Sequence, residues 1–122
     1  MRSSEFNPDL LAHLEKHCPA GSIIPTISSG APNRIAYLRP IGIGVETDRS
    51  RSRGDAPQLV PAWMVDVAWR RLHERGSLTN RELLASEGLN VKRSSFVCAL
   101  LAQLPGIVIC SHRPIALELS PR

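Results

Sequence analysis

The chain has 122 residues, of which 43% are hydrophobic, and its 15 basic and 11 acidic side chains give a net charge of +4. This length and composition exclude a wholly disordered chain and suit one compact domain, or a small domain with an accessory unit. The apolar runs are shorter than the roughly 18 residues of a membrane helix, and the N-terminus lacks the apolar core of a signal peptide. We therefore expect a soluble, cytoplasmic protein that has no membrane partner.

The cysteines and the charge distribution narrow this further. Cys18, Cys98 and Cys110 are an odd number in apolar surroundings, which argues against a disulfide framework, and the latter two are expected to be small buried hydrophobes. Thirteen of the 15 basic residues are arginine, and the excess charge lies in the C-terminal half, where residues 61–113 carry +3. An anionic partner would be attracted there.

A short helix is expected at the N-terminus. Asn7 is a suitable N-cap, and Pro8 fits the first helical position. Phe6 and Leu11 have the spacing of a hydrophobic staple, in which the residue before the cap packs on the first turn. Pro19 ends the helix, so this element is brief.

A small β unit should follow the helix. Residues 22–27, 34–38 and 41–47 are rich in Ile, Val and Thr and are separated by turn signals, which predicts a three-stranded antiparallel meander. Ile41, Ile43 and Val45 alternate with Gly and Glu, as in a strand with one buried face. The glycines here lack the rest of a dinucleotide fingerprint, so no cofactor is expected.

Residues 48–60 are predicted to be a linker, because their first ten residues are poor in apolar side chains and have no periodicity. This divides the chain into an N-terminal unit, residues 1–47, and a C-terminal domain, residues 61–122. The linker carries three arginines that could contact phosphate or simply be solvated: Arg49, Arg51 and Arg53.

The C-terminal half begins with a strong helical pattern over residues 61–75. Its apolar stripe consists of Met64, Ala68 and Leu72. Asp66 and Arg70 fall on the opposite, polar face as a favourable pair one turn apart. Gly76 is at the usual position for a helix C-terminus.

Two further helices are expected. Thr79 and Glu82 form a capping box, which predicts that a second helix begins at Asn80. Asn90 can cap a third helix over residues 91–104, whose apolar positions repeat every four residues and should be buried. The opposite, exposed side of this third helix should hold Lys92, Ser95, Ala99, Ala102 and Gln103.

The chain should end in a β-hairpin. Residues 107–110 and 115–119 are short β segments that flank a turn containing His112, Arg113 and Pro114. The predicted fold class is therefore α+β: an N-terminal helix and a small antiparallel β unit, followed by three helices and a hairpin.

The order of helix, short helix, tight turn, longer helix and hairpin over residues 61–119 resembles the winged helix-turn-helix superfamily of DNA-binding proteins. The most specific segment is residues 78–101, which holds the helix-turn-helix pattern. The resemblance implies that the third helix enters the major groove and that the hairpin is a wing.

The resemblance and the charge pattern together define the expected DNA contacts. The first turn of the third helix suits phosphate and base-edge contacts, and Arg93 is the candidate for reading guanine. Arg113 at the hairpin tip is expected to reach the backbone or the minor groove. The full set is Arg81, Asn90, Lys92, Arg93, Ser94, Ser95, His112 and Arg113.

No catalytic constellation accompanies this pattern, so we expect a protein that binds rather than an enzyme. His13, His17 and Cys18 could in principle ligate a metal together with Cys110 and His112, but without a C-x-x-C motif a solvated helix face is the better interpretation. No metal or other cofactor is expected.

Two functions remain open. The first is a DNA-binding module that contacts duplex DNA, as a transcription regulator or as the DNA-reading piece of a restriction or mobile genetic element system. The second is a winged-helix protein–protein adaptor within a larger complex. In either case a homodimer or a larger assembly is a possible partner state.

Overall fold

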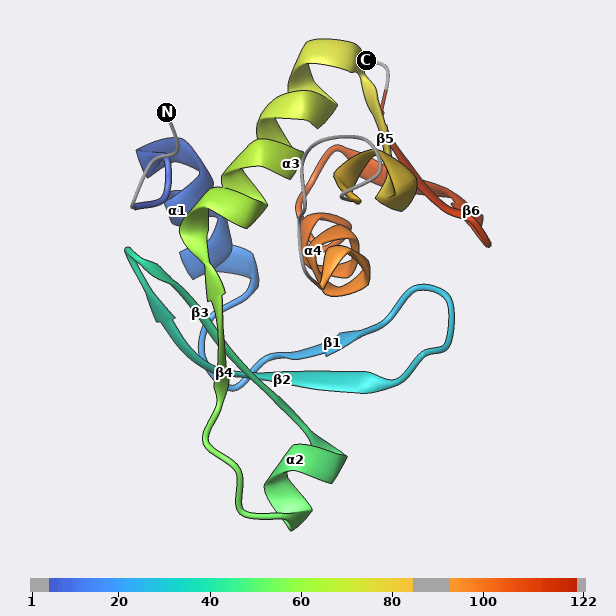
Figure 1. Ribbon diagram of the computed structural model, residues 1–122. Helices are drawn as coiled ribbons and strands as arrows, with labels where there is room; N and C mark the ends of the chain where they lie inside the picture. The colour runs from blue at the N-terminus through green and yellow to red at the C-terminus, as the bar shows by residue number, and fades with distance from the viewer. Residues whose placement is uncertain (1–4, 85–92, 121–122) are drawn as a thin grey trace.

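The computed structural model describes residues 5–84 and 93–120 of the chain. These residues form an α+β fold with two antiparallel sheets (Figure 1). The elements in chain order are α1 (Pro8–His17), β1 (Ile23–Pro25), β2 (Pro32–Arg39), β3 (Gly42–Thr47), α2 (Asp48–Ser52), β4 (Gln58–Pro61), α3 (Ala62–Arg75), β5 (Ser77–Thr79), the 3₁₀ helix η1 (Asn80–Leu83), α4 (Ser94–Leu101), β6 (Ile107–His112) and β7 (Ile115–Leu119). The helices α3 and α4 contact strands of both sheets. None of the helices described is long and apolar enough to cross a membrane.

The first sheet has the strand order β1-β2-β3-β4, all antiparallel. The predicted meander is confirmed for its three strands, and Ile43 and Val45 are buried as expected. Ile41, expected to share that buried face, is instead half exposed in the turn before β3. Within β3, Gly44 is required because the Tyr37 ring lies over it and would overlap a Cβ atom.

The predicted linker is structured in part, which corrects the sequence-based expectation. Its first residues form α2, where the side chains of Thr47 and Ser50 each accept a hydrogen bond from the other residue's backbone N–H. Its last residues form β4, which pairs with β3 and buries Val60. Two adjacent apolar residues, Leu59 and Val60, at the end of a polar segment were too weak a signal to indicate a strand.

The helix α1 begins as expected and is tied to α3 by a long-range contact. The Asn7 side chain accepts a hydrogen bond from Asp9 N at 2.8 Å, which confirms the cap. The Asp66 carboxylate of α3 accepts hydrogen bonds from Asn7 N at 3.1 and 3.3 Å. Asp66 is therefore only 5% exposed, although its spacing predicted a solvated face. Burial raises the pKa of Asp66, although the bond from Asn7 and the charge of Arg70 both lower it.

The second sheet has the order β5-β7-β6, with β5 and β6 each antiparallel to β7. The capping box of Thr79 and Glu82 is confirmed, but the helix that follows it is the single 3₁₀ turn of η1. The strand β5, which precedes it, was not predicted. The predicted hairpin is confirmed as β6 and β7, with β6 extending two residues further, to His112.

The third predicted helix is confirmed as α4, over fewer residues than expected. Its described part runs from Ser94, and it ends at Leu101 rather than Leu104. The backbone N–H groups of Gln103 and Leu104 donate to the carbonyls three residues earlier, so the final turn tightens before Pro105.

A single hydrophobic core joins the two halves of the described chain. Its fully buried large side chains come from α1, both sheets and the helices α3 and α4, for example Leu10, Ile35, Leu72, Leu100 and Leu117. Cys98 is buried as predicted, whereas Cys110 is exposed because it lies on β6, at the edge of its sheet.

Candidate nucleic-acid interface

The helix α4, expected to enter the major groove, lies in the interior of the molecule. It contacts α3, β1, η1 and β7, and Figure 1 shows it between α3 and the first sheet. Ala99, predicted to face a groove, is 0% exposed, and Ser94 is 7% exposed. Ser95 is half-buried. The expectation of an exposed α4 face is therefore wrong at Ala99, because the N-terminal unit supplies a second surface against which α4 packs.

Arg93, at the start of α4, is exposed and has an unusual backbone conformation. Its φ of 60° and ψ of 37° place it in the left-handed region. For a residue other than Gly, this backbone conformation costs roughly 1–2 kcal/mol of conformational free energy. The surrounding structure must therefore hold Arg93 in it. Its carbonyl accepts the hydrogen bond from Val97 N at 3.0 Å, which begins the helix. Arg93 is therefore an exposed side chain at the N-cap of α4.

Arg93 lines two adjacent hollows beside the edge strand β4. One, of about 380 Å³, is largely apolar and is lined by Gln58, Leu59, Val60, Pro61, Met64 and Arg93. The other, of about 190 Å³, is more polar and is lined by Val45, Thr47, Ser50, Arg53, Asp55, Ala56, Gln58 and Arg93. The second hollow, called the polar crevice below, brings Arg93 beside a residue of the former linker, Arg53.

The arginines differ in how far they are already paired within the described chain. Glu82 forms ion pairs with Arg71 at 3.5 Å and with Arg75 at 3.2 Å. Arg53 pairs with Asp55 at 2.8 Å, while both side chains stay about half exposed. The ion pairs between described residues do not include Arg49, Arg51 or Arg93, whose charges face solvent.

The sequence predicted a freely projecting hairpin tip, but the tip is bonded to another part of the chain. The guanidinium of Arg113 donates hydrogen bonds to the backbone carbonyl oxygen of Ser28, from Nη2 at 2.9 Å and from Nε at 3.2 Å. Ser28 lies in the loop between β1 and β2, so this loop covers one side of the tip. His112 and Arg113 remain exposed in spite of this contact.

The other residues predicted to contact DNA are not linked to the polar crevice by any interaction between described residues. Arg81 is exposed on η1, next to the Glu82 carboxylate. Asn90 and Lys92 lie outside the described residues. Sequence reasoning missed Arg53 as a neighbour of Arg93; the only signal was the row of arginines in the linker, and β4 had to be known before the two could be placed together.

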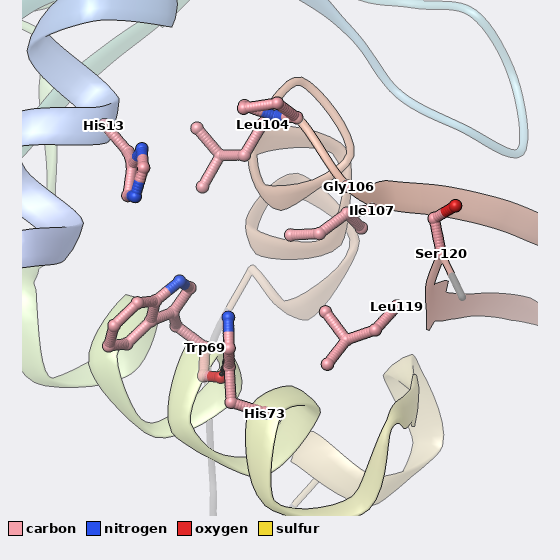
Figure 2. A pocket seen from close by; sticks show the side chains of 9 residues that line it. His13, Trp69, His73, Leu104, Gly106, Ile107, Leu119 and Ser120 are labelled. Carbon is pink, nitrogen blue, oxygen red and sulfur yellow. Dashed lines mark hydrogen bonds between the residues drawn. The ribbon is translucent and has the colours of Figure 1, made fainter. Parts of the chain in front are cut away.

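A third hollow, of about 240 Å³, lies between α1, α3 and the start of β6 (Figure 2). His13, Trp69 and His73 line one side, and Leu104, Ile107 and Leu119 line the other. His73 Nδ1 is 2.8 Å from the Trp69 carbonyl oxygen, and the two rings are 4.5 Å apart at their centroids. These contacts hold the His73 ring against the preceding turn of its own helix, α3.

The histidine and cysteine side chains considered for a metal do not assemble within the described residues. No group of three or more His, Cys, Asp or Glu side chains placed to hold a metal ion occurs in that part of the chain. Cys18 is fully buried, and burial raises its pKa to about 11, so its thiol is protonated at neutral pH. A protonated thiol is a poor metal ligand.

The chain was also compared with other proteins. Its comparison with protein-family models, with curated proteins and with solved structures found no match.

Proposed function

We propose that the chain is a non-enzymatic DNA-binding protein that holds duplex DNA through phosphate contacts made by arginines around the polar crevice. The observation that carries the proposal is that Arg93, at the start of α4, and Arg53, next to α2, line the same hollow. Two chain segments that are distant in sequence thus present guanidinium groups on one surface. Guanidinium groups are well suited to phosphate oxygens, which they bind in a bidentate manner.

A third arginine, Arg49, lies on α2 next to this surface, although it does not line the crevice itself. Arg49 lies one helical turn before Arg53, and Arg53 N donates to the Arg49 carbonyl at 3.2 Å. Side chains four residues apart lie on the same side of a helix, so Arg49 and Arg53 face the same way. Asp55 offsets part of the charge of Arg53, which leaves Arg49 and Arg93 as the stronger phosphate contacts.

The order of α3, η1, α4 and the β6–β7 hairpin supports an interface of this kind at the start of α4. It follows the order that the resemblance to winged helix-turn-helix proteins implies. Because Ser94 and Ala99 are buried, base contacts fall to Arg93 rather than to a whole helix face. Binding should therefore discriminate less between DNA sequences than a helix inserted along its length into a groove would, because phosphate contacts dominate. The biological setting we propose is a regulator or the DNA-reading piece of a restriction or mobile-element system.

A titration of a fluorescently labelled duplex at several salt concentrations tests the proposal. The unaltered chain should bind with an affinity that falls steeply as salt rises. The variant R49A/R93A should bind more weakly and lower the slope of log K against log salt by about two. R39A is the matched control: Arg39 is also exposed, but it ends β2 and pairs with Gly42, at the opposite end of β3 from Thr47 and α2.

Two results would contradict the proposal. One is binding by R49A/R93A that equals the unaltered chain in affinity and salt dependence. The other is a loss of affinity per removed charge that is the same in R39A as in the double variant, which would indicate a diffuse response to net charge rather than a defined interface.

The second candidate function is a protein–protein adaptor, favoured by the burial of α4 and by the apolar hollow beside β4. That hollow of about 380 Å³ includes the exposed Leu59 and is bounded by Met64. An adaptor would show no salt-dependent affinity for DNA in the titration described above, and L59D would then abolish partner capture without changing stability.

A further inference from the structure

The strand β6 forms an open edge of the second sheet. Within the described residues it pairs with β7 alone, and it stands at the end of the order β5-β7-β6. Val108 is 45% exposed, Ile109 is 41% exposed, and Cys110 is exposed as well. Three consecutive apolar side chains at an edge are therefore in contact with solvent.

An edge strand presents unpaired backbone N–H and C=O groups, so the natural occupant is another β-strand. Proteins usually prevent such pairing with charged side chains, proline or a β-bulge on the edge. The residues of β6, Ile-Val-Ile-Cys-Ser-His, include no proline and no Asp, Glu, Lys or Arg. A register shift between Ile109 and Ser111 is the irregularity that β6 shows. Ser111 and His112 pair with β7 again beyond this shift, so the strand is extended at both of its ends.

The charges at the two ends of β6 are complementary. Glu118 of β7 is paired with Val108 near the beginning of β6, and its side chain is exposed. His112 and Arg113 lie at the other end. When two copies of a strand pair antiparallel, the beginning of each meets the end of the other. The acidic end of one copy would then lie beside the basic end of its partner.

We propose that a second copy of this chain pairs antiparallel along β6, so that the two β5-β7-β6 sheets join into one continuous sheet across a two-fold axis. Such an interface is isologous, because the same strand is used by both copies. A pairing limited to one short strand should bury less than the roughly 1,200 Å² of a standard stable interface. The dimer is therefore weak, and its population depends on protein concentration.

Analytical ultracentrifugation in a reducing buffer without DNA tests this inference independently of DNA binding. The weight-average mass of the full chain should rise above that of a monomer as the concentration increases. V108K should remain monomeric, because it places a lysine near the partner's Arg113. The new lysine lies opposite Glu118 of its own sheet, and this pair of opposite charges should keep the variant folded. I41K is the matched control, since Ile41 is also half exposed but lies in the turn before β3.

A charge variant and a cross-linking measurement complete the test. E118K should also weaken association, because it removes the acidic end of the pair. Mild oxidation should trap a disulfide-linked dimer through the exposed Cys110, and C110S should abolish the trapped species but keep the reversible dimer. A parent chain that stays monomeric at every concentration overturns the proposal, as does association of V108K equal to that of I41K.

Discussion

The guanidinium of Arg113, at the tip of the last hairpin, is hydrogen-bonded to the backbone carbonyl of Ser28, 85 residues earlier in the chain. This contact links the C-terminal hairpin to the loop between β1 and β2, and β1 itself packs against α4. The N-terminal sheet and its β1–β2 loop therefore contact α4 and the hairpin tip, the two elements from which the sequence predicted DNA contacts. This arrangement is why the interface proposed here uses Arg49, Arg53 and Arg93 rather than a groove-inserted helix.

The contact between Arg113 and Ser28 should make a small contribution to stability. We expect R113A to lower the free energy of unfolding by about 0.5–1.5 kcal/mol, the usual worth of a hydrogen bond and modest here because the site is exposed. Urea denaturation of R113A measures it, with H112A as a control for the neighbouring exposed position. A change within error of zero would show that the bond does not persist in solution.

Leu100 should be one of the most sensitive positions of the core. Its side chain is fully buried in α4. L100A should therefore lower the free energy of unfolding by about 2–5 kcal/mol, which combines lost transfer free energy with the cost of a cavity. V108A removes apolar atoms from an exposed position and should change stability by less than about 0.5 kcal/mol. Similar losses in both variants would contradict the position of α4 inside the core.

The three thiols should differ sharply in reactivity. Burial raises the pKa of Cys18 to about 11, and burial together with the charge of Glu82 raises the pKa of Cys98 to about 12. Only the thiolate reacts, and a buried thiol is also out of reach of the reagent, so these two should be inert near neutral pH. Desolvation and the neighbouring Glu118 raise the pKa of Cys110 as well, but its thiol is exposed, so Cys110 should be the native thiol that reacts. A thiol-specific chromogenic reagent should count one group in the native protein and three in denaturant. Rapid modification of more than one native thiol would contradict this.

Asp66 should give a pH-dependent contribution to stability. Its pKa in the folded state is raised above the ordinary value of 3.8, chiefly by burial. The folded state therefore favours the protonated form, so this stabilisation is complete below pH 3.8 and is lost as pH rises through the higher folded pKa. Measured against D66N, the free energy of unfolding of the parent should fall across this range. A difference that stays constant with pH would show that the pKa of Asp66 is not raised.

Local signals along the chain were predicted well, because each involves residues only a few positions apart. The Asn7 cap, the box of Thr79 and Glu82, the alternation of Ile43 and Val45, and the hairpin around Arg113 all belong to this class. Their energetics depend on neighbouring backbone groups and on side chains one turn or two residues away. The α+β class and the order of the helices in the C-terminal half follow from them.

The tertiary structure decided which of these surfaces are covered. Asp66 has the spacing of a solvated residue, yet it is buried and accepts a hydrogen bond from Asn7 N. Ala99 lies on the helix face that the sequence predicted to be exposed, yet it is buried because α4 contacts α3, β1, η1 and β7. The sequence alone determined that the chain forms amphipathic helices, two β units and an arginine-rich surface. Whether a given face meets solvent or protein depends on contacts between distant segments, and periodicity within a single segment carries no information about those contacts.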